Sequence, residues 1–195
     1  GTDILQINYQ SKQPDAVQKY FELVLFKSDY PAIFPKHATL EYHKENHTLY
    51  ISMELPHPDL IPREKEIIKS PEDKKEIVIS YSKKEFVKLY NDIIYKIILK
   101  TFHELFSADK HETVDAINFS GWVKTLNRGN GQFENTHIAS LFASREMFAE
   151  INLKQVDPEI CFRYLKGISG PVLSDLKSIT VPFTIHQRNG QSGSA

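Results

Sequence analysis

The chain has 195 residues, of which 41% are hydrophobic and 25% are charged, and its formal net charge is -1. This composition is typical of a soluble globular protein, and it excludes a uniformly basic nucleic-acid coat and an acidic disordered tail protein. A single cysteine, Cys161, excludes an internal disulfide and a cysteine-cluster zinc site.

No part of the sequence indicates a membrane segment or a targeting signal. No apolar run approaches the roughly 20 residues that span a bilayer. Polar residues at Asp3, Gln6 and Asn8 interrupt the opening of the chain, where a signal peptide needs an apolar core. We therefore expect a cytoplasmic protein with no membrane partner.

The first 75 residues predict a helix followed by a β-hairpin. Pro14 suits a first helical turn, and apolar residues spaced by three and four positions predict an amphipathic helix over 14–28. Strand-forming residues on both sides of a polar turn at 44–47 predict a hairpin over 37–55. Residues 61–75 are charged and bounded by prolines, which indicates a solvated excursion.

A long helix over about 83–106 is the strongest local prediction, after a short strand at 76–81. Ser82 and Glu85 have the capping-box spacing, and a wide apolar stripe follows them. Such a stripe normally lies against a sheet or between helices. We expect Leu89 and Leu99 to point away from this stripe and to form an exposed interaction surface.

The remainder of the chain predicts a second hairpin and short helices. Segments 113–126 and 133–143 are expected to be strands joined by a glycine-rich turn at 127–131. Ser144 is positioned to cap a short helix that begins at Arg145. Asp157 and Pro158 open another helix, which Gly167 can end in a left-handed conformation.

These elements predict an α+β fold, with antiparallel β-hairpins packed against a long central helix and short helices at the C-terminal end. The segments 1–75 and 76–186 are expected to form one compact domain. Residues 187–195 are small and polar, and they predict a flexible tail.

Histidines and carboxylates are frequent, but their spacing does not predict a metal site. His37, His43 and His47 belong to the first hairpin, and neither an HExxH motif nor a Cys/His spacing occurs. A second group lies where the long helix ends, and we interpret it as a solvated helix end. Its members are His103, Glu104, Asp109, His111, Glu112 and Asp115. We expect no metal and no cofactor, and a small metal-dependent hydrolase is the third of three hypotheses.

No motif for nucleophilic catalysis or phosphate binding occurs in the sequence. A metal-dependent nuclease needs an Asp on one strand and a Glu-x-Lys or Gln-x-Lys pair on the next. Glu41, Glu134 and Glu150 each lack the lysine two positions later. The sequence therefore predicts a non-catalytic chain.

A local nucleic-acid surface is compatible with the charge distribution. From Lys124 onward the chain has eight Lys and Arg against six Asp and Glu. We expect Lys124, Arg128 and Arg145 around one end of the second hairpin, where they would contact phosphates. Trp122 would lie nearby and stack on a base. The alternative interpretation of these four residues is an ordinary charged rim.

Several short segments, taken in order, resemble a known family. They are residues 90–95 (YNDIIY), 103–109 (HELFSAD), 114–123 (VDAINFSGWV) and 143–148 (ASREMF), with further short matches between 151 and 167. Together they resemble the segment upstream of the nuclease domain in Mrr-like restriction-endonuclease proteins, over about residues 83–183. In that family a PD-(D/E)xK core follows, and none of its motif is present in this chain.

The resemblance implies a non-catalytic accessory domain of an Mrr-like, type IV endonuclease system, acting in recognition, regulation or self-association. The implied partners are DNA, a nuclease domain or a second copy of the chain. The alternative is a protein-interaction or dimerisation module.

Overall fold

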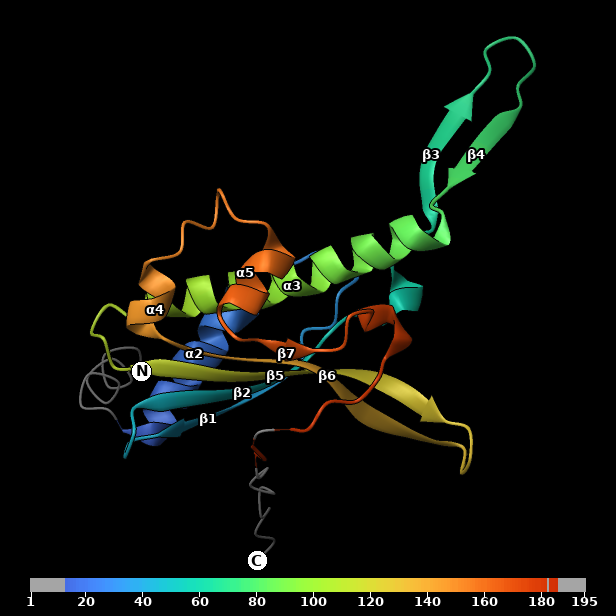
Figure 1. Cartoon of the computed structure of the whole chain (residues 1–195). Helices are drawn as coiled ribbons and strands as arrows, with labels where there is room; N and C mark the ends of the chain where they lie inside the picture. Colours follow the sequence, from blue (N-terminus) through green and yellow to red (C-terminus); the bar gives the residue numbers. More distant parts are fainter. Residues whose placement is uncertain (1–12, 182, 186–195) are drawn as a thin grey trace, which may run out of the picture.

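A mixed sheet of five strands, in the order β1-β2-β5-β6-β7, forms the centre of the computed structural model (Figure 1). The structure describes residues 13–181 and 183–185. Helices α2, α3, α4 and α5 lie against one face of the sheet. The predicted α+β class is therefore confirmed. The polar opening at Asp3, Gln6 and Asn8 and the predicted tail at 187–195 lie outside the described residues.

The first helix and hairpin form as predicted. Helix α2 (Pro14–Lys27) begins at a proline and buries Val17, Phe21 and Leu25. Strands β1 (Ala38–His43) and β2 (Thr48–Glu54) pair antiparallel. Because α2 packs against β1, residues 14–54 contribute an edge and a cover to the central sheet.

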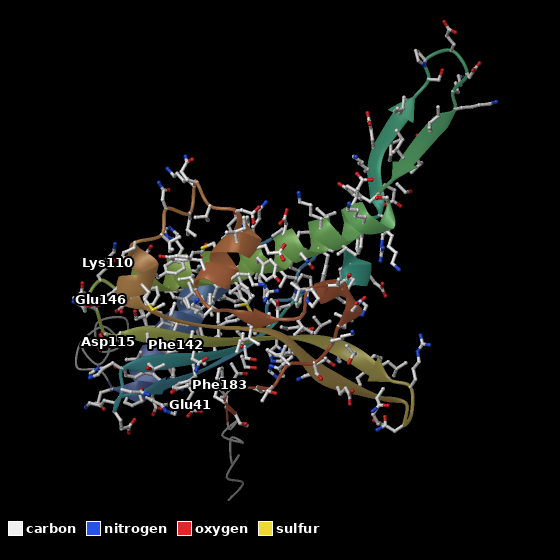
Figure 2. All side chains as sticks on the ribbon, viewed as in Figure 1. Glu41, Lys110, Asp115, Phe142, Glu146 and Phe183 are labelled. Atoms are coloured by element: carbon white, nitrogen blue, oxygen red, sulfur yellow. The ribbon has the colours of Figure 1, made fainter. Side chains whose placement is uncertain are left out.

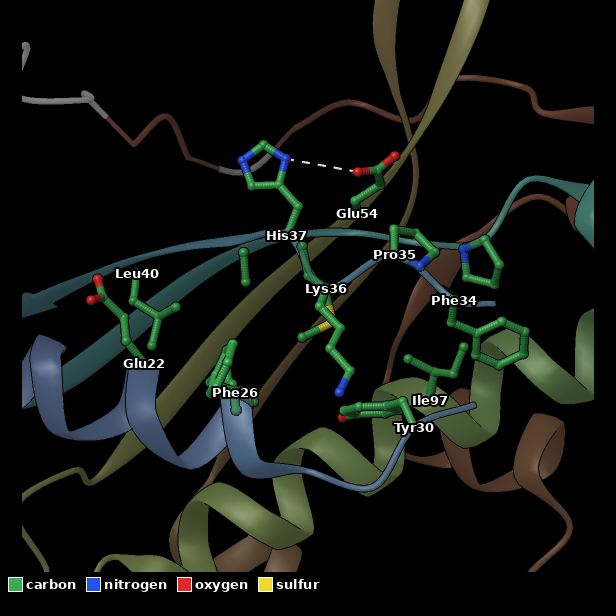
Figure 3. Close-up of a pocket in the computed structure, with 14 residues that line it drawn as sticks. Glu22, Phe26, Tyr30, Phe34, Pro35, Lys36, His37, Leu40, Glu54 and Ile97 are labelled. Carbon is green, nitrogen blue, oxygen red and sulfur yellow. Dashed lines mark ion pairs between the residues drawn. The ribbon is translucent and has the colours of Figure 1, made fainter. Parts of the chain in front are cut away.

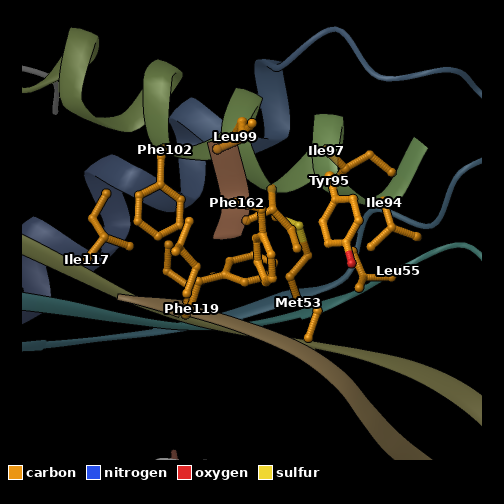
Figure 4. Close-up of a cluster of buried hydrophobic side chains, with 14 of the residues drawn as sticks. Met53, Leu55, Ile94, Tyr95, Ile97, Leu99, Phe102, Ile117, Phe119 and Phe162 are labelled. Atoms are coloured by element: carbon orange, nitrogen blue, oxygen red, sulfur yellow. The ribbon is translucent and has the colours of Figure 1, made fainter. Parts of the chain in front are cut away.

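Helix α3 (Lys83–Ala108) is the longest element and has the predicted capping box. The Glu85 N–H donates to the Ser82 Oγ at 3.1 Å, and the Ser82 N–H donates back to the Glu85 carboxylate at 3.1 Å. Figure 4 shows Phe102 and Phe119 in contact across the space between α3 and the sheet. No helix among the described residues is both long and apolar enough to cross a bilayer.

The expected exposure of Leu99 is wrong. Leu99 is only 3% exposed, and Leu89 is partly buried against the core. Helix α5 (Pro158–Tyr164) packs on α3, so the long helix is covered by this helix as well as by the sheet. The periodicity of the apolar stripe identified only the face that meets the sheet.

A parallel pair of strands joins the two halves of the sheet. Strand β2 pairs in parallel with β5 (Ala116–Asn127), from Thr48 opposite Ala116 to Glu54 opposite Trp122. A parallel pair needs a long crossover connection, and α3 supplies it. The sequence predicted the strands but not this pairing. The 1–75 and 76–186 segments thus share one sheet.

The second hairpin consists of β5 and β6 (Gln132–Ser144), with the predicted turn between them. A β-bulge interrupts their register between Gly121 and Trp122. A side chain at Gly121 would collide with Leu55, so this position needs glycine for close packing.

The C-terminal elements are α4 (Arg145–Ala149), α5, β7 (Ile168–Ser169) and the 3-10 turn η2 (Leu173–Asp175). The left-handed residue after α5 is Lys166, with φ of 64°, so the predicted left-handed role of Gly167 is wrong. A Cβ at Gly167 would lie 2.5 Å from the ring of Phe162. Gly167 is therefore needed for a close approach of backbone to ring.

A buried ion pair closes the end of α3. Asp109 is 3% exposed, and its carboxylate accepts from the N–H groups of Thr113 at 3.0 Å and Val114 at 2.8 Å. Arg145 pairs with the same carboxylate and donates to the carbonyls of Val114 at 2.9 Å and Phe106 at 3.3 Å. The expectation of a wholly solvated helix end is therefore wrong for Asp109.

Replacing Asp109→Ala is expected to lower the free energy of unfolding by about 3 kcal/mol, because it leaves the half-buried Arg145 without its counter-charge. Chemical denaturation followed by circular dichroism measures this change. Asp115→Ala is the matched control, because Asp115 is exposed, and it should cost less than about 0.5 kcal/mol. Equal losses in both variants would contradict a structural role for the ion pair.

Candidate functional site

A two-stranded ribbon projects from the body of the molecule at the start of α3 (Figure 1). It consists of β3 (Glu64–Lys69) and β4 (Glu76–Ser80), and we call residues 64–80 the β-arm. Every residue in both strands is exposed. The solvated excursion predicted after residue 61 is confirmed, but it is a hairpin that includes the predicted strand at 76–81.

The β-arm has apolar side chains on both faces. Ile67 lies opposite Val78 on one face, and Ile68 lies opposite Ile77 on the other, which also carries Ile79. These five aliphatic residues are between 39% and 56% exposed. An isolated two-stranded ribbon is only marginally stable in water, and contiguous exposed apolar surface marks an interaction site.

The base of the β-arm is fixed to α3. The guanidinium carbon of Arg63 lies 3.4 Å from the ring centroid of Phe86, and the Tyr81 N–H donates to the Arg63 carbonyl at 2.9 Å. The Lys65 ammonium lies 2.7 Å from the Glu85 carboxylate. The hydrogen bond from Lys65, together with those from Ser82, lowers the pKa of Glu85 to about 2. Beyond this base, side chains of the arm extend into solvent (Figure 2).

The β-arm has no excess of positive charge. Residues 64–80 include four basic and five acidic side chains. A surface for the phosphate backbone needs an excess of positive charge, and this segment has none. The chemistry of the arm therefore favours a protein surface over a nucleic acid.

The four predicted DNA-contact residues do not come together. Lys124 and Arg128 are exposed toward the turn of the β5–β6 hairpin, but Arg145 follows β6 at the opposite end, where Ser144 pairs with Ala116. Trp122 is only 7% exposed, and its ring packs edge-on against His37 at 5.5 Å. Trp122 is thus unavailable for stacking on a base, and the hydrogen bonds of Arg145 are directed inward.

The tip of the β5–β6 hairpin retains a smaller exposed patch. The Lys124 ammonium lies 5.7 Å from the ring centroid of Phe133, which is 66% exposed. Leu126 pairs with Phe133 across the hairpin and is also exposed. This patch joins a cation to an aromatic ring, as in surfaces that contact single-stranded bases and phosphates.

A cavity of about 240 Å³ lies between α2, β1 and α3 (Figure 3). Its apolar lining includes Leu25, Leu40, Met53 and Ile97. At its rim His37 lies 3.7 Å from the carboxylate of Glu54. The apolar part of the lining is suited to apolar groups, while the His37 imidazole and the Glu54 carboxylate at the rim contact each other.

Ser120 and His137 form a hydroxyl–imidazole pair that the sequence analysis missed. The Ser120 Oγ lies 2.6 Å from the His137 Nδ1, and burial lowers the pKa of His137. The two residues are on adjacent strands, and no local motif links them. Ser120 is 0% exposed, so its hydroxyl cannot reach a substrate. The pair therefore satisfies polar groups within the sheet.

The histidines of the first hairpin have protein partners. His43 contacts the Glu41 carboxylate and the ring of Tyr50, and the His47 Nδ1 lies 3.2 Å from the Tyr42 hydroxyl. Within residues 13–181 and 183–185, no group of three His, Cys, Asp or Glu side chains is placed to hold a metal ion.

Comparison of the chain with protein-family models, with curated proteins and with solved structures gives no significant match. The resemblance to the upstream segment of Mrr-like proteins therefore stays a prediction. The β-arm is the candidate functional site because its own contacts leave its apolar surface uncovered.

Excising the β-arm should leave the body folded. In this variant an Asn-Gly turn replaces residues 64–80, which is feasible because Arg63 and Tyr81 are already hydrogen-bonded to each other. Few packing contacts are lost, so thermal unfolding should show a Tm within about 3 °C of the intact chain. A cooperative transition that is lost or lowered much further would show that the arm is a structural element.

Proposed function

We propose that this chain is a non-catalytic protein-interaction module that docks through the β-arm. The observation that carries the proposal is a ribbon anchored at its base, with five aliphatic side chains exposed on its two faces. In this proposal the docking surface is the β-arm and not the Leu89–Leu99 surface that was expected from the sequence.

A partner would cover the exposed apolar side chains of the β-arm and pair with the backbone groups at its edges. Covering a half-exposed Ile or Val side chain is worth about 1 kcal/mol. The ribbon also has two free edges whose backbone groups can pair with an added strand. Addition of a strand to such an edge is a common mode of protein recognition, in which the backbone gives affinity and the side chains give specificity.

The companion role implied by the Mrr-like resemblance is compatible with this function. A module that acts through contact needs no catalytic group, and a nuclease domain would be one protein partner among several. The arm itself has one more acidic than basic side chain, so the proposal does not depend on DNA.

The proposal is tested by photo-crosslinking in the organism that encodes the chain. A photoreactive side chain placed at Val78 should give adducts of discrete mass, because Val78 lies in the centre of β4 and is exposed. The same group at Lys19, which is exposed on α2, is the positional control. Gel electrophoresis and mass spectrometry measure the adducts.

The adducts at Val78 should disappear when Ile77→Lys and Ile79→Lys are added, because charge would then occupy the apolar face. Adducts of equal yield from Lys19, or none from Val78 under any growth condition, would contradict docking through the arm.

A second candidate function is nucleic-acid contact at the tip of the β5–β6 hairpin. The placement of Lys124 beside the exposed ring of Phe133 favours it, with Arg128 in the adjoining turn. In this function Lys124 and Arg128 keep the DNA-contact role that the sequence predicted, and Trp122 and Arg145 do not.

The double substitution of Lys124→Ala and Arg128→Ala should weaken binding to a single-stranded oligonucleotide of random sequence. The slope of log K against log salt should fall in magnitude by about 1.4, because two phosphate contacts are lost. Fluorescence anisotropy across a salt series measures it. The charge-matched control, Lys19→Ala with Lys27→Ala, should not change the slope. An equal change in the control, or no binding at low salt, would remove this candidate.

A further inference from the structure

The outer edge of β4 has the properties of a self-pairing strand. We propose that the β-arm docks on a second copy of this chain, through antiparallel pairing of the two β4 strands about Val78. This inference rests on the proposed function, since it names the partner of the same surface.

The hydrogen-bonding pattern of the arm determines which backbone groups are free for such pairing. The Ser70 N–H donates to the Lys75 carbonyl, and the Tyr81 N–H donates to the Arg63 carbonyl. In an antiparallel ladder, alternate residues direct their backbone groups toward the partner strand. Lys75 and Tyr81 thus belong to the inward set, together with Ile77 and Ile79. The N–H and C=O groups of Glu76, Val78 and Ser80 point outward.

A two-fold axis at Val78 pairs all of these outward groups. Val78 then lies opposite Val78 of the second copy, and Glu76 lies opposite Ser80 in both directions. Ile77 lies opposite Ile79, so aliphatic side chains meet on one face, and cross-strand pairs of this kind stabilise a sheet. The sequence Glu-Ile-Val-Ile-Ser is apolar and nearly symmetric about its centre, so it complements itself.

Charge favours the antiparallel arrangement over a parallel one. Parallel in-register pairing would place Glu76 beside Glu76 of the second copy, and like charges on neighbouring strands destabilise a sheet. The antiparallel register separates these two carboxylates to opposite ends of the interface.

The edge of β3 is unsuited to the same pairing. Its outward residues include Ile67 and Lys69, and symmetric pairing about Ile67 would place Lys65 against Lys69 of the second copy. A register shift between Glu64 and Glu66 also distorts this strand. Edge lysines and bulges are features that block strand addition. The second copy therefore adds at β4.

The expected assembly is a closed dimer with a four-stranded sheet in the order β3-β4-β4-β3. Three or more strands give a sheet independent stability that a lone ribbon lacks. Both outer edges of the new sheet are β3 strands, so the assembly ends at two copies and does not extend into a filament.

Disulfide trapping tests the register with a matched pair of variants. Val78→Cys places thiols at Cα positions about 5.5 Å apart in the dimer, within the range for a disulfide. Ile67→Cys is the control, because Ile67 lies opposite Val78 on the same face and is similarly exposed. In the dimer its Cα positions are about 14 Å apart, at three strand spacings, which is too far for a disulfide.

Under mild oxidation of the purified full-length chain, Val78→Cys should form a covalent dimer and Ile67→Cys should stay monomeric. The native Cys161 is buried, and the unsubstituted chain reports any contribution from it. Equal dimer formation by the two variants would overturn the proposal, because it would indicate random collision or packing through the face of the ribbon.

Sedimentation velocity over a concentration series provides the second measurement. The sedimenting mass of the unsubstituted chain should double as concentration rises, and Ile77→Lys with Ile79→Lys should abolish the change. Leu126→Lys with Phe133→Lys removes a comparable exposed apolar pair from the other hairpin and should leave the dimer intact. Circular dichroism melts would verify that both double variants are folded.

The two proposals fail in different ways. A chain that is monomeric at every concentration overturns self-pairing. If photoreactive Val78 still gives adducts in cells, with masses other than twice the chain, docking through the arm stands with a different partner. If it gives none, both proposals fail.

Discussion

The buried pairing of Asp109 with Arg145 is the interaction on which the rest of the architecture depends. Asp109 ends α3 and binds the N–H groups that lead into β5, while Arg145 begins α4 at the end of β6. One ion pair thus fixes the end of the long helix to both strands of the second hairpin. Strand β5 lies parallel to β2 with Ala116 opposite Thr48, so the chain must leave α3 close to the start of β2. The ion pair holds the end of α3 against the residues that lead into β5 and thereby supports this register.

Several polar side chains in the body of the molecule are used for structure. Asp109 and Arg145 hold an end of a helix, and Ser120 and His137 satisfy each other inside the sheet. The buried apolar residues of the body are similarly occupied by the contact between α3 and the sheet (Figure 4). The β-arm carries five exposed aliphatic side chains within a segment of seventeen residues, and this cluster is the reason for which we propose a binding function.

Local sequence patterns predicted most of the elements because those patterns act over a few residues. The capping box at Ser82, the glycine-rich turn after β5 and the caps at Ser144 and Asp157 all lie where expected. Properties that depend on distant pairing were missed. The parallel contact of β2 with β5 and the packing of α5 on α3 join residues that are far apart in the sequence. The arm was missed as a site because exposed aliphatic strands have the same local pattern as buried ones.

The position of the β-arm also affects how the sequences of related chains can change during evolution. Arg63 and Tyr81 meet at the base of the arm, so the seventeen positions between them contribute little to the packing of the sheet. Under the proposed function, substitutions there would be constrained by the docked partner and not by the core. Descendants of one ancestor could therefore acquire new specificities by altering this insertion alone, while they keep an unchanged scaffold.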